Sequence, residues 1–327
     1  MSMEAPHVVY KFGGTSVGTA PRFRTVIDIV RRTAGEGRVV AIVSAQGKVT
    51  RRLSAAMEAF ATQADPRSAV VDGLIEDLRG RHRAQAEEVL SPEMLDRYVD
   101  VMEERLDALR AVFGQVERDG FTPAARDAVL ATGEQLSVPM VTLALRDAGC
   151  TAPFCDATAL VVTDATFGEA NVDLEATAQR VRAWYEELAP DAVPVVAGFI
   201  GATVDGDTTT LGFEGSDYSA ALFAHILGAR CLTRYTDVDG LYTADPETDP
   251  TAKRLDRLSM EDAFARTEAG RLGMHPKTLR PLAEAGIPMQ VRSIDDPGGN
   301  GTQIVPEGRS NVLFTPPVEM TAPSSLP

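Results

Sequence analysis

The sequence predicts an α/β protein: an αβα three-layer sandwich with a mainly parallel central sheet and two lobes. Short apolar segments alternate with longer segments of helical periodicity along most of the chain, as in proteins whose helices cover both faces of a parallel sheet. The segment Arg38–Val43 contains the run VVAIV. A run that is apolar without alternation is typical of a parallel strand covered on both faces.

The predicted elements alternate in type along the chain. Strands are expected at His7–Phe12, Arg38–Val43, Val161–Val162, Val193–Ile200, Thr208–Leu211, Cys231–Tyr235, Met289–Arg292 and Thr302–Val305. Helices are expected at Ala20–Arg32, Ala124–Ala148, Glu175–Leu188, Asp217–Leu227, Ser259–Thr267 and Pro276–Ala285. We expect one domain over residues 1–305. Residues 306–327 are expected to form a partly disordered tail, because this proline-rich segment has little to bury.

A helical insert is predicted between the strands, over residues 53–118. Ala, Leu, Glu and Arg recur there at helical spacing, and Pro66 and Pro92 interrupt the pattern. We therefore expect two or three helices in this segment. They either cover the core as a helical hairpin or supply the surface of a homodimer.

Composition excludes several classes of function. The chain has 327 residues and a net charge of −15, so we expect no nucleic-acid partner and no membrane partner, which would favour a basic surface. The longest apolar run, Val193–Ile200, is far too short to cross a bilayer, and Met1–Glu4 has no feature of a signal peptide. The three cysteines predict a reduced, cytoplasmic protein. The spacing of Cys150 and Cys155 does not suit zinc, so no metal site is expected.

The first motif that carries chemistry is Lys11–Val17 (KFGGTSV), directly after a predicted strand. Its two glycines let the backbone approach a ligand, and consecutive N–H groups can form an anion nest. The lysine can bring a positive charge to a phosphate. The motif predicts phosphate binding, and the alternative is a tight strand-to-helix turn with an incidental lysine.

Two further motifs lie later in the chain. Leu211–Tyr218 (LGFEGSDY) is a glycine-rich turn that opens a helix, which Ser216 or Asp217 can cap. Thr236–Pro246 (TDVDGLYTADP) gathers acids and a tyrosine after a strand, at the edge where ligands bind in open α/β sheets. An aspartate there could orient lysines or hold a ribose, and the tyrosine could lie on adenine. Plain capping and ordinary Asp-Gly and Asp-Pro turns are the alternatives.

These motifs, in this order, resemble those of the amino acid kinase superfamily, and specifically of aspartate kinases. The stretches Val43–Thr50, Ala131–Ser137, Met274–Leu279 and Gly301–Thr302 agree with the resemblance. It implies ATP-dependent phosphorylation of the side-chain carboxylate of L-aspartate to an acyl phosphate, with Mg²⁺ bridging the nucleotide phosphates. It also implies an amino-acid-binding lobe over about 1–200 and a nucleotide-binding lobe over about 201–305.

The resemblance implies roles for individual residues. Lys11 would hold the transferring phosphoryl group, and Asp217 would orient that lysine. Glu134 would pair with the ammonium group of the substrate. The other residues implied are Gly13, Gly14, Ser16, Ser216, Thr236, Asp237, Tyr242 and Lys277 for the nucleotide, and Ser44, Thr50 and the position of Phe213 for the amino acid.

Some charges of the family are missing on the amino-acid side. Where the family reads Gly-Arg-Gly-Gly-Ser-Asp, this chain reads GFEGSD over Gly212–Asp217. Phe213 thus replaces the arginine that grips the α-carboxylate of aspartate, and Glu214 adds a negative charge. We expect weaker aspartate binding unless Lys48 or Arg51 replaces that arginine. Alternatively, both face solvent.

The nucleotide side departs from the family as well. Glu247 stands where the family has an arginine, and Leu272 where it has a phosphate-binding lysine. Cations at new positions (Arg271, Lys277 or Lys253) could supply the lost charge. Alternatively, the enzyme is slow or accepts a related amino acid, or the chain is a non-catalytic nucleotide-binding paralog.

The C-terminal end carries a further expectation. Only about twenty residues follow Ile304, whereas typical aspartate kinases continue there into ACT regulatory domains. We therefore expect those domains to be lacking, and with them feedback inhibition by end-product amino acids. Alternatively, the sequence is a truncated part of a longer chain.

Overall fold

The computed structural model describes residues 6–307 apart from 63–66, 245, 247, 271 and 273. Most of the predicted tail, together with Glu247 and Arg271, lies outside the described residues.

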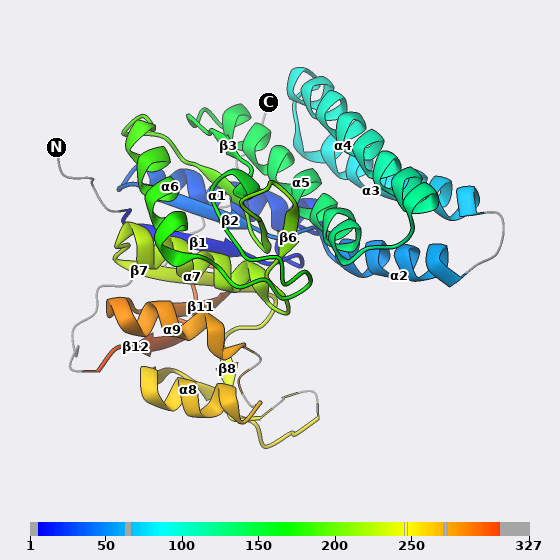
Figure 1. Ribbon diagram of the computed structural model, residues 1–327. Helices are drawn as coiled ribbons and strands as arrows, with labels where there is room; N and C mark the ends of the chain where they lie inside the picture. The colour runs from blue at the N-terminus through cyan, green and yellow to red at the C-terminus, as the bar shows by residue number, and fades with distance from the viewer. Residues whose placement is uncertain are drawn as a thin grey trace.

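One eight-stranded sheet forms the centre of the protein (Figure 1). Its strand order is β10-β12-β11-β7-β1-β2-β4-β3. The pairs from β11 to β3 are parallel, whereas β12 is antiparallel to β11. The strands are β1 (Val8–Phe12), β2 (Val39–Val43), β3 (Phe154–Cys155), β4 (Val195–Ala197), β7 (Cys231–Thr236), β10 (Arg257–Ser259), β11 (Met289–Ser293) and β12 (Thr302–Val305). Every residue of β1 and β2 is buried, as expected for parallel strands with both faces covered.

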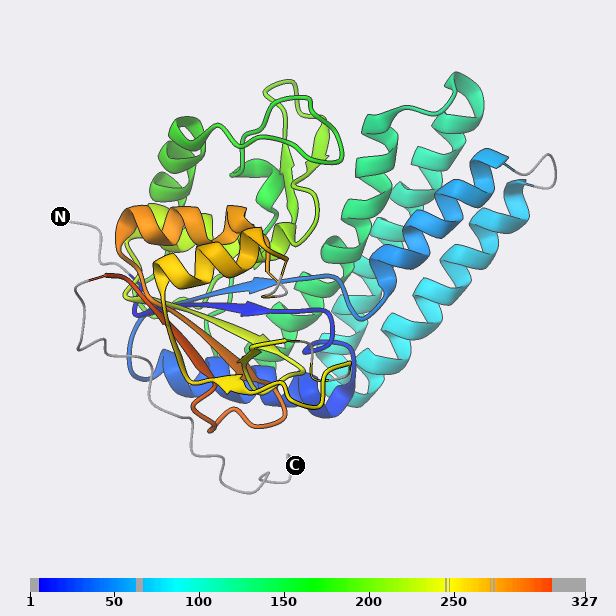
Figure 2. The same ribbon diagram turned by 90° about the horizontal axis from the view of Figure 1, so that it is seen from below.

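Helices cover both faces of this sheet, so the predicted three-layer architecture is confirmed. Figure 2 shows α1 (Ala20–Ala34) on one face and α8 (Met260–Glu268) and α9 (Pro276–Ala285) on the other. α7 (Gly215–Leu227) contacts β1, β2 and β7 as well as α6 (Leu174–Glu187) and α9. α7 ends at Gly228, whose φ of 66° favours glycine.

The predicted helical insert contains three helices that project from one side of the sheet with α5 (Figure 1). They are α2 (Val49–Thr62), α3 (Arg67–Val89) and α4 (Pro92–Asp119). Pro92 begins a helix instead of breaking one, because a first-turn residue needs no N–H partner. Pro66 lies outside the described residues.

α5 (Pro123–Asp147) connects the insert to the sheet and contacts α2, α4 and β4. Among the described helices it is the one that is long and apolar enough to cross a membrane. However, 89% of its apolar window is buried inside the protein. Core packing therefore accounts for its composition.

The structure corrects two strand predictions and places a third predicted strand, Thr208–Leu211, outside the main sheet. The predicted strand Val193–Ile200 divides into β4 and β5 (Ile200–Ala202), because Phe199 takes a positive φ of 71° between them. β5 pairs with β6 (Thr208–Thr210) as a separate antiparallel hairpin outside the main sheet. Val162 forms only an isolated bridge, with Ala202, and β3 occupies the sheet edge instead.

Several elements of two or three residues were not predicted, because so short a segment shows no period. These are β3, η1 (Ala157–Ala159), β10, and the two-stranded ribbon of β8 (Leu241–Tyr242) and β9 (Arg254–Leu255).

Candidate active site

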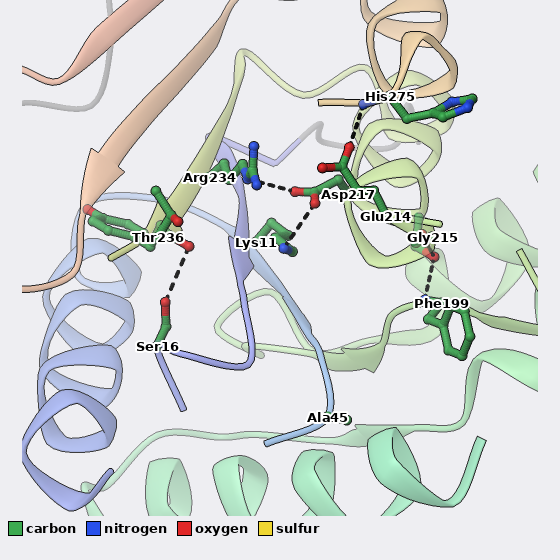
Figure 3. Close-up of polar contacts among 12 residues, drawn as sticks. Lys11, Ser16, Ala45, Phe199, Glu214, Gly215, Asp217, Arg234, Thr236 and His275 are labelled. Atoms are coloured by element: carbon green, nitrogen blue, oxygen red, sulfur yellow. Dashed lines mark hydrogen bonds and ion pairs between the residues drawn. The ribbon is translucent and has the colours of Figure 1, made fainter. Parts of the chain in front are cut away.

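Lys11 and Asp217, the two residues predicted to be catalytic, meet in the structure (Figure 3). Lys11 lies on β1, and Asp217 lies in the first turn of α7, which packs against that strand. The Lys11 ammonium donates to Asp217 Oδ2 at 3.1 Å, and the two side chains are only 8% and 4% exposed. Burial lowers the pKa of Lys11, and the negative charge of Asp217 opposes that effect. The carboxylate therefore positions the lysine and helps to keep it charged.

A second cation, Arg234, contacts the same carboxylate from β7. Arg234 is the register partner of Lys11 on the neighbouring strand, and its Nε lies 3.2 Å from Asp217 Oδ1. Burial alone would raise the pKa of Asp217, but Arg234 and Lys11 outweigh it and hold that pKa below its ordinary value. Asp217 is therefore ionised at neutral pH and compensates the repulsion between two adjacent cations.

Glu214 adds a second carboxylate to this cluster. It is the residue before α7 and takes a φ of 56°, which costs a residue other than glycine about 1 kcal/mol or more. The backbone N–H of His275, at the start of α9, donates to Glu214 Oε2. Burial raises the pKa of Glu214, and the positive charge of Arg234 opposes the rise. Glu214 thus links the starts of α7 and α9 beside the charged cluster (Figure 3).

The glycine-rich turn after β1 packs tightly against the loop after β2. A Cβ at Gly14 would lie 2.6 Å from the carbonyl oxygen of Ala45, so only glycine fits there. A Cβ at Gly13 would lie 3.4 Å from Lys11 Nζ. The Ser16 hydroxyl donates to the carbonyl oxygen of Tyr235 at 3.2 Å and ties the turn to β7. A backbone this bare, beside an ammonium group, suits the approach of a phosphate.

Ser216 is a buried residue in the first turn of α7. A Cβ at Gly198 would lie 2.7 Å from Ser216 Cβ. The glycine after β4 therefore allows the start of α7 to approach the sheet, which brings Asp217 within reach of Lys11.

Glu134 lies in the middle of α5 and is 2% exposed. The backbone N–H of Ala45 donates to its Oε1 at 3.0 Å, whereas its Oε2 has no hydrogen-bond partner among the described residues. Burial raises the pKa of Glu134 to about 8, against the opposing effects of that hydrogen bond and of Lys11. A buried carboxylate oxygen without a partner is unusual. An ammonium group on a ligand would satisfy it.

The other residues predicted for the amino acid lie on different elements and differ in exposure. Ser44 follows β2, and its N–H donates to the carbonyl oxygen of Phe12 at 3.1 Å. Thr50 is half-buried in the first turn of α2. Phe213 is 81% exposed. Lys48 and Arg51 are also exposed, in agreement with the solvent-facing alternative.

Among the residues predicted for the nucleotide at the end of β7 and after it, some line a cavity and one is exposed. Thr236 and Tyr242 line a cavity of about 560 Å³, and Leu272 and Arg234 line it as well. This volume lies within the range of ligand pockets, roughly 300–1,000 Å³. Asp237 is exposed and accepts a hydrogen bond from the Thr236 hydroxyl at 3.1 Å.

The lysines proposed as replacement cations do not line that cavity. The Lys277 ammonium lies 3.0 Å from Glu169 Oε1, in a partly exposed ion pair. Lys253 is exposed. Arg271, the third candidate, lies outside the described residues.

The charged side chains at the centre of the site pair with one another. Among the described residues, no three His, Cys, Asp or Glu side chains cluster as metal ligands, and Asp217 is already paired with two cations.

Sequence reasoning missed two contributors to the site. Arg234 is a charged residue inside a predicted buried strand, which is itself a signal, because unpaired charges are costly there. The other is the backbone N–H of Ala45, which no side-chain pattern reveals.

Comparisons with known proteins agree with this geometry. The sequence model of the amino acid kinase family matches residues 6–293. The chain is 31% identical over 298 residues to bifunctional aspartokinase/homoserine dehydrogenase 1 of Zea mays. The matched region covers 90% of this chain and 32% of the maize protein. It is 31% identical over 307 residues to lysine-sensitive aspartokinase 3 of Escherichia coli, with 94% of this chain and 66% of that protein covered.

A solved structure is also similar to this chain. The crystal structure of E. coli aspartokinase III with aspartate and ADP matches with a TM-score of 0.81 and 30% identity, over 93% of this chain and 65% of that one. The chain thus spans about a third of the length of the maize relative and just under two thirds of that solved chain. With the family's sequence model matched over nearly all of the described residues, the chain belongs to the amino acid kinase family, as an aspartokinase-like domain.

Proposed function

We propose that this chain transfers the γ-phosphoryl group of MgATP to the side-chain carboxylate of L-aspartate. The observation that carries the proposal is the pairing of two features in one site. The Lys11–Asp217 ion pair suits a phosphoryl group, and the unpartnered buried oxygen of Glu134 suits an ammonium group. Ala45 links the two features, because its N–H donates to Glu134 and its carbonyl oxygen lies against Gly14 of the turn that follows Lys11. A relative of known structure holds aspartate and ADP.

The proposed reaction requires little covalent help from the protein. An oxygen of the substrate carboxylate forms a bond to the γ-phosphorus, and the bond from that phosphorus to the bridging oxygen breaks, which releases ADP and an acyl phosphate. Because the carboxylate is already ionised at neutral pH, no general base is needed. Catalysis then depends on position and on charge. Lys11 would hold the transferring group, and Mg²⁺, bound to the nucleotide, would neutralise its phosphates.

A second candidate substrate follows from Phe213. This residue stands where the family has its α-carboxylate arginine, and it is 81% exposed. Without another cation at that position, the site would favour an amine-bearing acid that lacks the α-carboxylate, such as β-alanine. The cytoplasmic location and the homodimer predicted from the sequence remain predictions.

An acyl-phosphate trap tests the proposal. The protein is incubated with MgATP, hydroxylamine and one of five acids: aspartate, glutamate, N-acetylglutamate, β-alanine or succinate. Lys11→Met serves as the control for catalysis by this site. We expect hydroxamate with aspartate from the wild-type protein and none from the variant.

Each other outcome has a defined meaning. Hydroxamate with β-alanine alone would replace aspartate by the second candidate. The absence of hydroxamate with every acid would contradict both candidates and favour a non-catalytic nucleotide-binding paralog.

A further inference from the structure

Arg234 is a charge inside the central sheet. It lies between two neighbours of the same register, Lys11 on β1 and Val291 on β11, and its side chain is only 15% exposed. Placing a guanidinium there costs free energy that apolar residues would not. The position therefore calls for a reason beyond packing.

The cavity beside Arg234 offers that reason. Thr236, two residues further along β7, lines the same cavity, as expected because alternate strand residues share a face. Leu272, where the resemblance to aspartate kinases implies a phosphate-binding lysine, is buried and lines the same cavity. Among the described residues that line the cavity, Arg234 is the one that carries a charge.

A purely electrostatic role is the competing explanation. Asp217 is buried and Glu214 is half-buried, and both acids lie beside one lysine, so Arg234 could serve only to balance them. However, the ion pair with Asp217 is made by one guanidinium nitrogen, Nε. A guanidinium presents five N–H donors in a planar fork, so it can bridge a carboxylate and a phosphate at the same time.

Resting on the proposed function, we infer that Arg234 binds the phosphate chain of the nucleotide in this cavity and takes the place of the lysine that Leu272 has replaced. Asp217 then holds both cations, with Lys11 and Arg234 side by side on adjacent strands. Because phosphate charge grows from AMP to ATP, the contribution of Arg234 should grow in the same order.

Nucleotide binding without any acid substrate tests this assignment. Dissociation constants for MgATP, MgADP, AMP and adenosine are measured by isothermal titration calorimetry for the wild type, Arg234→Met and Arg234→Lys. The matched control is Arg230→Met, which removes the same charge from an exposed residue just before β7. Thermal melting confirms that each protein is folded.

We expect Arg234→Met to weaken MgATP binding by about tenfold to a hundredfold, the usual range for a charge-assisted hydrogen bond. Adenosine binding should change less than about threefold, and Arg230→Met should resemble the wild type. Arg234→Lys keeps a cation for Asp217 but loses the fork. Arg234→Lys should lose more affinity for MgATP than for adenosine. If Arg234→Met does not fold, this difference in Arg234→Lys tests whether Arg234 binds the phosphates.

The double variant Glu214→Gly/Arg234→Met separates the two explanations. It restores the glycine of the family and removes the acid that Arg234 would balance. A phosphate-binding arginine predicts that MgATP affinity stays low, whereas recovery to the wild-type value would overturn the assignment. Equal MgATP affinity in the wild type and Arg234→Met would overturn it as well. If the wild type bound no nucleotide, the proposed function itself would fail together with this assignment.

Discussion

The pH dependence of amino-acid binding follows from Glu134. Burial raises the pKa of its carboxyl group to about 8, and in the proposed reaction the substrate ammonium would pair with the ionised form. About one tenth of the free protein is ionised at pH 7 and about three quarters at pH 8.5. The apparent affinity for aspartate should therefore rise about eightfold between these two values.

Glu134→Gln removes the titrating group and keeps the shape of the side chain. We expect the KM for aspartate to rise about tenfold to a hundredfold, because a buried charged hydrogen bond is lost. We also expect KM to become independent of pH between 7 and 8.5. The assay is the initial rate of ADP release at saturating MgATP across this pH range.

Asp127→Asn is the matched control. Asp127 is a buried carboxylate on the same helix, but it accepts hydrogen bonds from the backbone of Gly168 at 2.8 Å and Thr210 at 2.7 Å. This variant should keep the pH dependence of the wild type. A wild-type KM that does not change with pH would refute the reasoning. So would a Glu134→Gln variant with the wild-type slope.

The remaining predictions concern packing and stability. Gly133→Ala places a Cβ 2.7 Å from the Cβ of Ala45, so this variant should lower Tm and raise the KM for aspartate. The control Gly73→Ala, whose Cβ meets nothing within 4 Å, should change neither the KM nor the fold. Burial lowers the pKa of His82 to about 4. Its contribution to the free energy of unfolding is therefore present above its unfolded pKa near 6.5 and is lost as pH falls toward 4. In urea unfolding, His82→Gln should remove up to about 3 kcal/mol of this loss of stability in acid. The pKa of Glu134 is raised instead, so its contribution is present below about pH 4.5 and is lost as pH rises toward 8; Glu134→Gln should lose less stability over that range.

The central strands and their covering helices could be predicted because their residues carry the signal themselves. β1 and β2 are uniformly apolar, and α9 has a proline at its start and a glycine after its end. The break at Phe199 could not be predicted, because a residue other than glycine rarely takes a positive φ. β3 and β10 have two and three residues, too few to show a period.

The candidate site also contains residues that could be predicted from the sequence and residues that could not. Lys11, Glu134 and Asp217 stand in motifs that the sequence displays, and the structure brings Lys11 and Asp217 together. The role of Arg234 could not be predicted, because it depends on the register of two strands more than 200 residues apart. The ion pair of Lys277 with Glu169 depends on the tertiary arrangement as well.

Phosphorus NMR of the reaction mixture tests the central claim most directly. The protein, MgATP and aspartate are followed over time without a trapping agent. We predict that the γ-phosphate signal of ATP is replaced by equal amounts of ADP and an acyl phosphate, only when aspartate is present and not with Lys11→Met. An unchanged ATP signal, or inorganic phosphate formed equally without aspartate, would contradict the proposal that this chain phosphorylates aspartate.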